Sequence, residues 1–197
     1  SEDPGEIRHY RSASSHPDTA EQTGSFPESR RSVPPAETEQ TVSSGAGTSD
    51  LADSMSGRPV TVRTDSVTAT LVGVARVPLA EFVYEHQLDD PHSTEAVRPV
   101  ALFDIENTGP RPLWWEASRT KFVGTDDYTY QPATVRLDDS RLGPGCHTRQ
   151  VEIEPGRRAR VATLVERLPA GVEVAEVVHT VSPGTFADKQ RLTFAVG

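Results

Sequence analysis

Apolar and polar residues alternate one by one in several short runs between residue 58 and the end of the chain. Residues 60–63 read Val-Thr-Val-Arg, and a later run places Ala101, Phe103 and Ile105 at every second position. Neighbouring side chains of a β-strand point to opposite faces, so this period of two predicts strands with one buried face. No stretch of ten residues has a clear apolar period of 3.6 residues, and we therefore expect an all-β domain.

The longest of these runs covers residues 67–77 and contains Gly73. A glycine inside a strand often marks a β-bulge, and we expect one here. The residues expected on the core face of this strand are Val67, Ala69, Leu71, Ala75 and Val77. Regular alternation stops at Pro78, and residues 79–96 form the longest insertion, with room for one short helical turn.

Turn-forming residues separate the runs, as in Asn107-Thr108-Gly109-Pro110. The runs predict about eight or nine strands, which is typical of an immunoglobulin-like β-sandwich with two facing sheets. Residues 58–197 are long enough to bury a core without disulfides, and we assign them to one such domain.

Residues 1–57 differ from the rest of the chain in composition. Ser, Thr, Pro and Gly fill 26 of the first 56 positions, whereas Leu, Ile, Val and Phe fill five. The same stretch contains ten acidic and four basic residues. So little apolar surface cannot offset the entropy of ordering the backbone, about 1–2 kcal/mol per residue. We expect a disordered acidic tail or linker.

The formal net charge of -9 argues against a nucleic-acid partner, because phosphate recognition needs a surplus of Lys and Arg. No run of about 18 apolar residues occurs, so we expect no direct membrane span. Lys is found only at positions 121 and 189, a bias that favours a GC-rich source, either a halophilic archaeon or an actinobacterium. No signal-peptide pattern is present, and whether a signal or anchor preceded Ser1 stays open.

Four motifs in order resemble a known group of domains: residues 103–109 (Phe-Asp-Ile-Glu-Asn-Thr-Gly), 122–130 (Phe-Val-Gly-Thr-Asp-Asp-Tyr-Thr-Tyr), 154–156 (Glu-Pro-Gly) and 168–171 (Leu-Pro-Ala-Gly). This succession is similar to the telokin-like, immunoglobulin-like domains of unknown function in bacterial and archaeal surface lipoproteins. The resemblance covers residues 58–197. It implies an extracellular or cell-surface location, while the absence of a signal-peptide pattern leaves a cytoplasmic location as the alternative. The resemblance supplies no catalytic residues. The chain departs from the pattern in its adjacent tryptophans and in lacking a lipid-attachment cysteine at its start.

Trp114 and Trp115 are the most distinctive local feature. On a strand, one ring fills the core while the other points outward, where a large and stiff amphipathic side chain is a candidate anchor for a partner. The alternative is that the insertion or the tail covers the outer ring. Tyr128 and Tyr130 share a face and are candidates to extend an aromatic patch, although we favour packing in the sandwich core.

Carboxylates at two turns could supply oxygens for Ca²⁺. Asp126 and Asp127 follow one strand, and Asp138 and Asp139 lie in a later loop. A calcium site needs six to eight oxygens, and the D-x-D-x-D-G spacing is missing. We interpret these residues as solvated turns.

Cys146, the only cysteine, and His147 could form a zinc site with His86 and His92. Their spacing matches no zinc finger or ribbon, and we predict no metal site and no cofactor. Cys146 follows Gly-Pro-Gly, which predicts an exposed loop, and a single cysteine excludes an intrachain disulfide.

The chain lacks G-x-S-x-G, H-E-x-x-H and a phosphate-binding glycine loop, and we expect no catalytic residues. Arg158 and Arg160 share a strand face within a basic cluster and predict an edge or surface that discourages strand addition. The function we expect is a non-catalytic module that binds another protein or its own copies. A structural subunit of a surface layer, filament or virion is the alternative, and a metal-dependent hydrolase a distant one.

Overall fold

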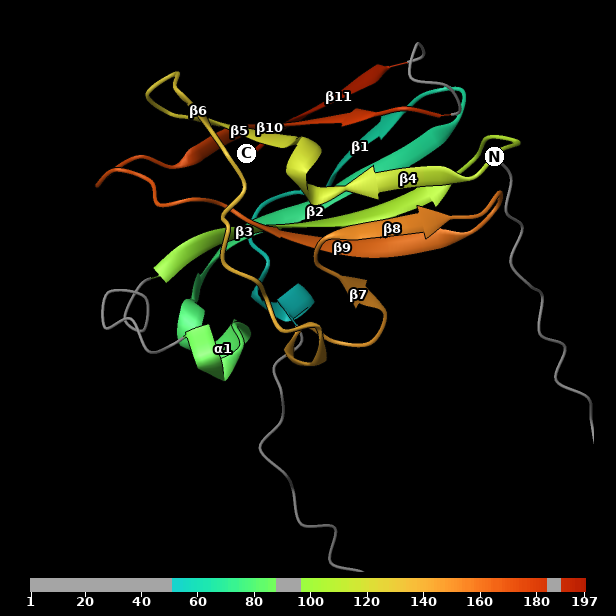
Figure 1. The fold of residues 1–197 in the computed structure, drawn as a ribbon. Coiled ribbons are helices and arrows are strands. Elements are labelled where there is room, and N and C mark those ends of the chain that lie inside the picture. Colours follow the sequence, from blue (N-terminus) through green and yellow to red (C-terminus); the bar gives the residue numbers. More distant parts are fainter. Residues whose placement is uncertain (1–50, 88–96, 184–188) are drawn as a thin grey trace, which may run out of the picture. The chain divides into compact units, whose positions relative to one another are not determined.

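The computed structural model describes residues 51–87, 97–183 and 189–197 (Figure 1). They all belong to the unit formed by residues 44–197. Its strands are β1 (Val60–Arg63), β2 (Val67–Pro78), β3 (Val97–Asn107), β4 (Leu113–Glu116), β5 (Thr120–Gly124), β6 (Thr129–Tyr130), β7 (Cys146–His147), β8 (Gln150–Ile153), β9 (Arg158–Leu164), β10 (Val174–Val181) and β11 (Gln190–Ala195). Its helices are α1 (Leu79–Phe82) and the 3₁₀ helices η1 (Leu51–Ser54), η2 (Glu85–Gln87), η3 (Ala117–Arg119) and η4 (Asp139–Arg141).

These strands form a sandwich, and the predicted all-β fold is confirmed. A five-stranded sheet has the order β1-β2-β3-β9-β7, and a four-stranded sheet has the order β11-β10-β5-β6. A two-stranded ribbon, β4-β8, completes the fold, and Figure 1 shows the two larger sheets as separate layers. Every pairing is antiparallel except that of β7 with β9.

The space between the layers holds what we call the inter-sheet core. Phe103 lies near its centre, with ring centroids 5.3 Å from Trp115 and 5.6 Å from Phe194. The buried residues of this core come from both large sheets and from the ribbon: Val67, Ala69, Leu71, Ala101, Phe103, Ile105, Leu113, Trp115, Phe122, Ile153, Val161, Val165, Val174, Val177, Val181, Leu192 and Phe194.

A bulge in β2 reverses the faces of this strand. Leu71 pairs with Phe103 and Gly73 with Leu102, so Val72 is an extra residue in the ladder. The bulge predicted near Gly73 is therefore present. The single core face predicted for residues 67–77 is wrong, because one inserted residue moves every later side chain to the opposite face.

The residues after the bulge join a second cluster, which we call the outer core. Ala75 and Val77 lie there, whereas residues 67–71 face the inter-sheet core. Its buried members come from the back of the five-stranded sheet and from the segments that cover it: Leu51, Ala75, Val77, Leu79, Phe82, Val83, Val100, Leu102, Leu137, Leu142, Cys146, Ala162 and Leu164. This sheet is thus buried on both faces over part of its length.

The residues of the outer core correct two predictions made from the sequence, the start of the domain and the exposure of Cys146. Leu51 is fully buried and Ser56 donates a hydrogen bond to the Val74 carbonyl, so the folded domain extends N-terminally beyond residue 58. Cys146 is 6% exposed in β7, and its predicted position in an exposed loop is wrong. The Gly-Pro-Gly sequence forms the turn that precedes it, and the thiol itself packs as a small apolar group. The rest of the predicted tail lies outside the described residues.

Gly73 has a second role besides the bulge. A methyl group at its Cα would lie 2.7 Å from the Ser56 carbonyl oxygen and 3.1 Å from Cβ of Met55. Only a residue without a side chain lets the segment after η1 pass this close to β2. The same small residue therefore permits both the bulge and the docking of the first described residues.

Candidate binding site

The ribbon β4-β8 positions the two adjacent tryptophans. Leu113 pairs with Ile153 and Trp115 with Val151, and these four side chains face the inter-sheet core. Trp115 is completely buried and stacks on His179 of β10, with centroids 3.5 Å apart and ring planes inclined by 4°. The predicted division of the pair, one ring inside and one outside, is what the ribbon shows.

His179 is held neutral in this stack. Its Nδ1 lies 2.9 Å from Oγ1 of Thr120, which is also buried. Burial lowers the pKa of His179 to about 3, and the nearby charge of Arg119 contributes in the same direction. An uncharged imidazole can pack face to face with the indole, so the ribbon is attached to β10 by a flat aromatic contact.

Trp114 lies on the opposite, outward face of the ribbon and is 44% exposed. Glu116 follows two positions later on the same face, and their register partners across the ribbon are Glu152 and Gln150. Residues two apart on a strand are about 6.5–7 Å apart. The outward face of the ribbon is therefore one apolar ring among three polar side chains.

Tyr128 and Tyr130 do not extend this face. Tyr128 is 71% exposed and precedes β6, whereas Tyr130 is half-buried and packs against the inter-sheet core. The Tyr130 hydroxyl donates to Oδ2 of Asp126 at 2.6 Å, and this hydrogen bond raises the tyrosine pKa to about 12. Figure 1 shows β6 at a distance from β4, so the two tyrosines do not extend an aromatic patch around Trp114. The favoured alternative, packing in the core, holds for Tyr130 and not for Tyr128.

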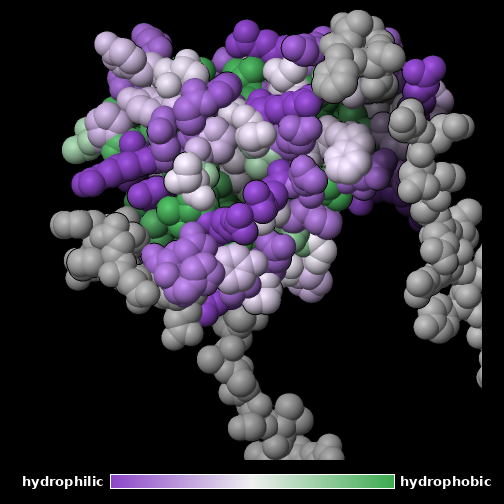
Figure 2. All heavy atoms as spheres, in the orientation of Figure 1, coloured by the Kyte–Doolittle hydropathy of each residue, from purple (hydrophilic) through white to green (hydrophobic). Residues whose placement is uncertain are grey.

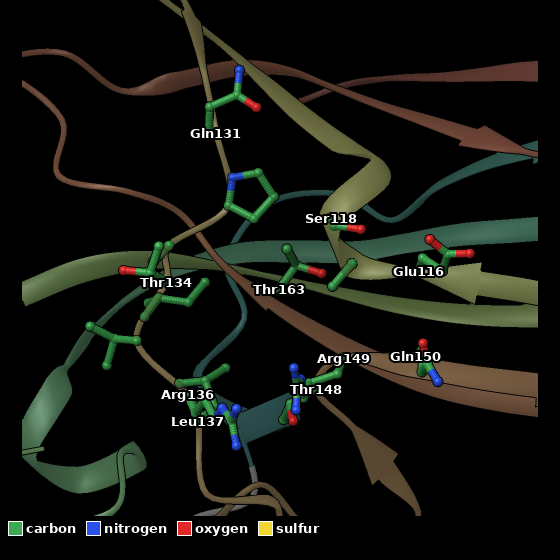
Figure 3. A pocket seen from close by; sticks show the side chains of 15 residues that line it. Glu116, Ser118, Gln131, Thr134, Arg136, Leu137, Thr148, Arg149, Gln150 and Thr163 are labelled. Carbon is green, nitrogen blue, oxygen red and sulfur yellow. The ribbon is translucent and has the colours of Figure 1, made fainter.

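A cleft of about 530 Å³ opens beside the ribbon (Figure 3). One wall comes from residues 116–118 and 148–150, the other from residues 131–137, and the bottom from Thr163 and Leu164 of β9. The volume lies within the range of small-molecule sites. Glu116 and Gln150 belong both to the cleft and to the outward face of the ribbon, so Trp114 lies next to the rim.

Hydrogen bonds hold both walls of the cleft in place. The Ala117 amide donates to the Arg149 carbonyl at 2.7 Å, and the Ala133 amide donates to the Leu164 carbonyl at 2.8 Å. The side-chain amide of Gln87 accepts from the Arg136 backbone N–H at 2.8 Å and donates to its carbonyl at 3.2 Å. The cleft is thus formed by paired backbone, which favours a preorganised site.

Arginines dominate the charge of the cleft. Arg136 and Arg149 are exposed, and in the part of the chain that the structure describes neither makes an ion pair. The one carboxylate of the lining, Glu116, is held by Arg119 through two contacts of 3.0 and 3.1 Å. The remaining polar groups are hydroxyls and amides of Ser118, Gln131, Thr134, Thr148, Gln150 and Thr163.

Sequence reasoning missed this cleft entirely. Its lining comes from four separate stretches between residues 116 and 164, each of which is ordinary loop or strand sequence. Arg136 and Arg149 are 13 residues apart and belong to no motif. No local signal could have brought them together, because the sheet pairing does so.

The predicted metal-ligand candidates serve turns instead. Oδ1 of Asp126 accepts from the Tyr128 amide, and Asp138 caps η4 through Ser140. Asp139 accepts from the Thr148 hydroxyl at 2.6 Å. Over residues 51–87, 97–183 and 189–197, no three His, Cys, Asp or Glu side chains are grouped closely enough to hold a metal ion.

The zinc candidates lie in different surroundings. His147 is half-buried beside the buried Cys146, while His86 is exposed and stacks on Tyr84 at 5.6 Å. His92 lies outside the described residues. Asp127, the remaining calcium candidate, is exposed and has a φ of 64°, as a tight turn requires.

The arginine cluster of β9 has a different role from the predicted one. Arg158 bonds Glu106 at 2.9 Å, and Arg160 makes two contacts with Asp104 at 2.7 and 2.9 Å. β9 lies between β3 and β7, but β7 pairs with Arg160 and Val161 and does not reach Arg158. Both arginines bond acidic side chains of β3. They are cross-strand pairs of opposite charge, which stabilise the register of β3 and β9.

The surface and the helices add two observations. The face of the domain in Figure 2 is mostly hydrophilic, with small separated hydrophobic areas. Among the described residues no helix has the length and apolar character needed to cross a bilayer.

Comparison with known proteins gives no family. No family model and no curated protein matches the chain. The solved structures that are similar to it include those of three bacterial proteins. The yjhA protein of Bacillus subtilis has a TM-score of 0.48 and 12% identity over 70% of this chain and 96% of its own. A functionally unknown protein from Listeria monocytogenes has a TM-score of 0.45 and 11% identity over 77% and 94%.

The third is ycdA of Bacillus subtilis, described as a "putative lipoprotein", with a TM-score of 0.42 and 12% identity. It matches 71% of this chain, which spans 39% of the length of that protein. At these levels of similarity the three structures carry no conclusion about function. Membership of the telokin-like domains stays a prediction from the sequence.

Proposed function

We propose that this domain is a non-catalytic binding module that captures another protein through the outward face of the ribbon β4-β8. The exposure of Trp114 supports this proposal. Its ring presents a large apolar surface at 44% exposure on a strand whose neighbouring residue, Trp115, is completely buried. Exposed tryptophans surrounded by polar residues are frequent binding hot spots.

The ribbon suits an anchor because it is rigid. Trp115 stacks on His179, and Leu113 and Ile153 are buried in the inter-sheet core. A side chain mounted on fixed backbone loses little conformational entropy when a partner covers it. The three polar residues around Trp114 would form a hydrated rim, as in protein interfaces with one central anchor.

The chemistry near the ribbon also suits binding rather than catalysis. In the cleft that adjoins the ribbon, the one lining carboxylate, Glu116, is engaged by Arg119, and the other polar groups are mainly amides, hydroxyls and guanidinium groups. Such groups donate and accept hydrogen bonds but do not act as general bases near neutral pH. We extend the proposal to a cell-surface location, supported by the resemblance of the sequence motifs to domains of surface lipoproteins.

The test is a pull-down with the purified full chain from an extract of the source organism. We expect a specific partner with the wild type and at least tenfold lower recovery with Trp114→Ala. Tyr128→Ala is the matched control, because Tyr128 is an exposed aromatic residue that precedes β6 and does not belong to the ribbon. Equal recovery by the wild type and Trp114→Ala, with both folded by circular dichroism, would overturn the proposal.

A further copy of this chain is one possible partner. Sedimentation velocity of the wild type and of Trp114→Ala at several concentrations distinguishes this case. Concentration-dependent association that the substitution removes would indicate self-assembly through the ribbon. A monomer at all concentrations would leave a different protein as the partner.

A further inference from the structure

We propose that the cleft beside β9 is a binding site for a small anionic ligand that carries a carboxylate or phosphate group. The inference goes beyond the proposed protein-binding face, because it depends on Arg136, Arg149 and Thr163 and not on Trp114. The cleft is large enough for a molecule of metabolite size, at about 530 Å³.

Two guanidinium groups define the ligand charge. Arg136 and Arg149 come from opposite walls, and Figure 3 shows both side chains directed into the space between these walls. In the described residues no carboxylate pairs with either of them. Two like charges on facing walls favour an anion between them, and the planar guanidinium group matches carboxylate and phosphate oxygens in two-point contacts.

The local charge contrasts with that of the chain. The formal net charge is -9, and the ion pairs of Arg119, Arg141, Arg158 and Arg160 neutralise nearby carboxylates. Glu116, the only carboxylate of the lining, is already paired with Arg119. The lining therefore keeps two guanidinium groups without an ion pair, although the carboxylates of Asp139 and Glu166 bond the lining residues Thr148 and Gln131 from outside it.

Thr163 supplies a second, independent observation. It is 2% exposed at the bottom of the cleft, and its hydroxyl has no hydrogen-bond partner among the described protein groups. A buried hydroxyl without a partner is unfavourable, because it has given up its hydrogen bonds to water. An oxygen of a ligand in the cleft would accept this hydrogen bond, while Arg136 and Arg149 hold the other oxygens nearer the opening.

The walls are built in a way that keeps the two arginines in place. Gln87 clamps the backbone of Arg136 with two hydrogen bonds, and Ala117 bonds the carbonyl of Arg149. Both contacts fix the main chain and leave the guanidinium groups available. A site of this kind needs little rearrangement to bind.

The experiment is a two-dimensional NMR titration of the full chain with inorganic phosphate and, separately, with succinate. Sodium chloride at matched ionic strength serves as the blank, and glucose as a neutral polyol. We expect saturable shifts confined to the amides of residues 116–118, 131–137, 148–150 and 163–164. Saturation with phosphate alone or with succinate alone would identify the chemical class of the natural ligand.

The variants make the assignment specific. We expect the double variant Arg136→Gln/Arg149→Gln to weaken anion binding at least tenfold and Thr163→Val to weaken it about three- to tenfold. Arg157→Gln is the matched control, because Arg157 is exposed in a turn outside the cleft, and it should bind as the wild type does. Trp114→Ala should also bind normally, which separates this site from the proposed protein-binding face.

Three results would overturn the proposal. One is the absence of saturable shifts with both anions. Another is equal weakening by Arg157→Gln and by the double variant, which would indicate non-specific attraction. The third is glucose binding as strongly as the anions, which would indicate a polyol site.

Discussion

The two faces of the five-stranded sheet bury side chains in different ways. The inter-sheet core is built from regular strands of two sheets and a ribbon, and it includes five aromatic or imidazole rings if His179 is counted with Phe103, Trp115, Phe122 and Phe194. The outer core is covered by short helices and irregular segments, and its buried members are mostly aliphatic. The bulge at Val72 divides β2 between the two.

This difference matters for the candidate binding surfaces. The inter-sheet core holds the ribbon through Leu113, Trp115 and Ile153, and so fixes Trp114. The outer core includes Leu137 and Leu164, which also line the cleft, so it supports the wall that carries Arg136. One sheet thus positions two surfaces through two separate cores.

The largest expected effect concerns the inter-sheet core. We expect Trp115→Ala to lower the free energy of unfolding by about 3–5 kcal/mol, because it removes a fully buried ring and leaves a cavity. Trp114→Ala should lower the same quantity less, by about 1–2 kcal/mol, since that ring is only partly covered. Urea denaturation of the two variants measures the contrast. Similar losses of stability in both variants would mean that the two rings do not lie on opposite faces of the ribbon, with Trp115 in the core and Trp114 outside.

A smaller effect is expected in the outer core. Leu142→Ala should lower the free energy of unfolding by about 2–3 kcal/mol, because the segment that covers this face can partly close the cavity. The same variant should weaken phosphate or succinate binding, while partner capture through Trp114 persists. If it abolished both kinds of binding equally, the two cores would not act separately.

A pH dependence sharpens the comparison further. The pKa of His179 is about 3 in the folded protein, against about 6.5 in an unfolded chain. Below pH 6.5 the unfolded state takes up a proton that the folded state does not, so stability falls as the pH is lowered toward 3, by about 1.4 kcal/mol per pH unit at most. Above pH 7 this contribution is constant.

The control for this prediction is His179→Gln, which cannot be protonated. The slope of unfolding free energy between pH 7 and pH 5 should be smaller in this variant than in the wild type. Equal slopes would show that His179 is accessible to protons in the folded state and that its stack on Trp115 is not buried.

The sequence predicted the inter-sheet core well and the outer core poorly, for a physical reason. Period-two alternation in residues such as Ala101, Phe103 and Ile105 identifies one buried face of a strand. It cannot show that Val100 and Leu102 are buried on the other face, because their coverage depends on distant residues such as Leu51 and Leu142. The bulge could be located from Gly73, but its consequence for the later side chains became clear only from the pairing.

The same reasoning applies to the candidate sites. The opposite orientation of Trp114 and Trp115 follows from strand geometry, so the sequence was sufficient to predict it. The cleft depends on residues 116–118, 131–137 and 148–150 meeting at β9, and such long-range contacts leave no trace in any one motif. For Cys146 the sequence led to a wrong prediction rather than to none. The local turn residues indicated an exposed loop, whereas tertiary packing buries the thiol.

The central claim is that the bulge in β2 sends its two halves into two different cores. Methyl-labelled NMR spectroscopy tests it directly through nuclear Overhauser effects from Leu71 and Val77. We predict contacts of Leu71 with inter-sheet core residues and contacts of Val77 with outer core residues. Cross-peaks that place the Val77 methyl groups in the inter-sheet core, on the same face as Leu71, would contradict the account.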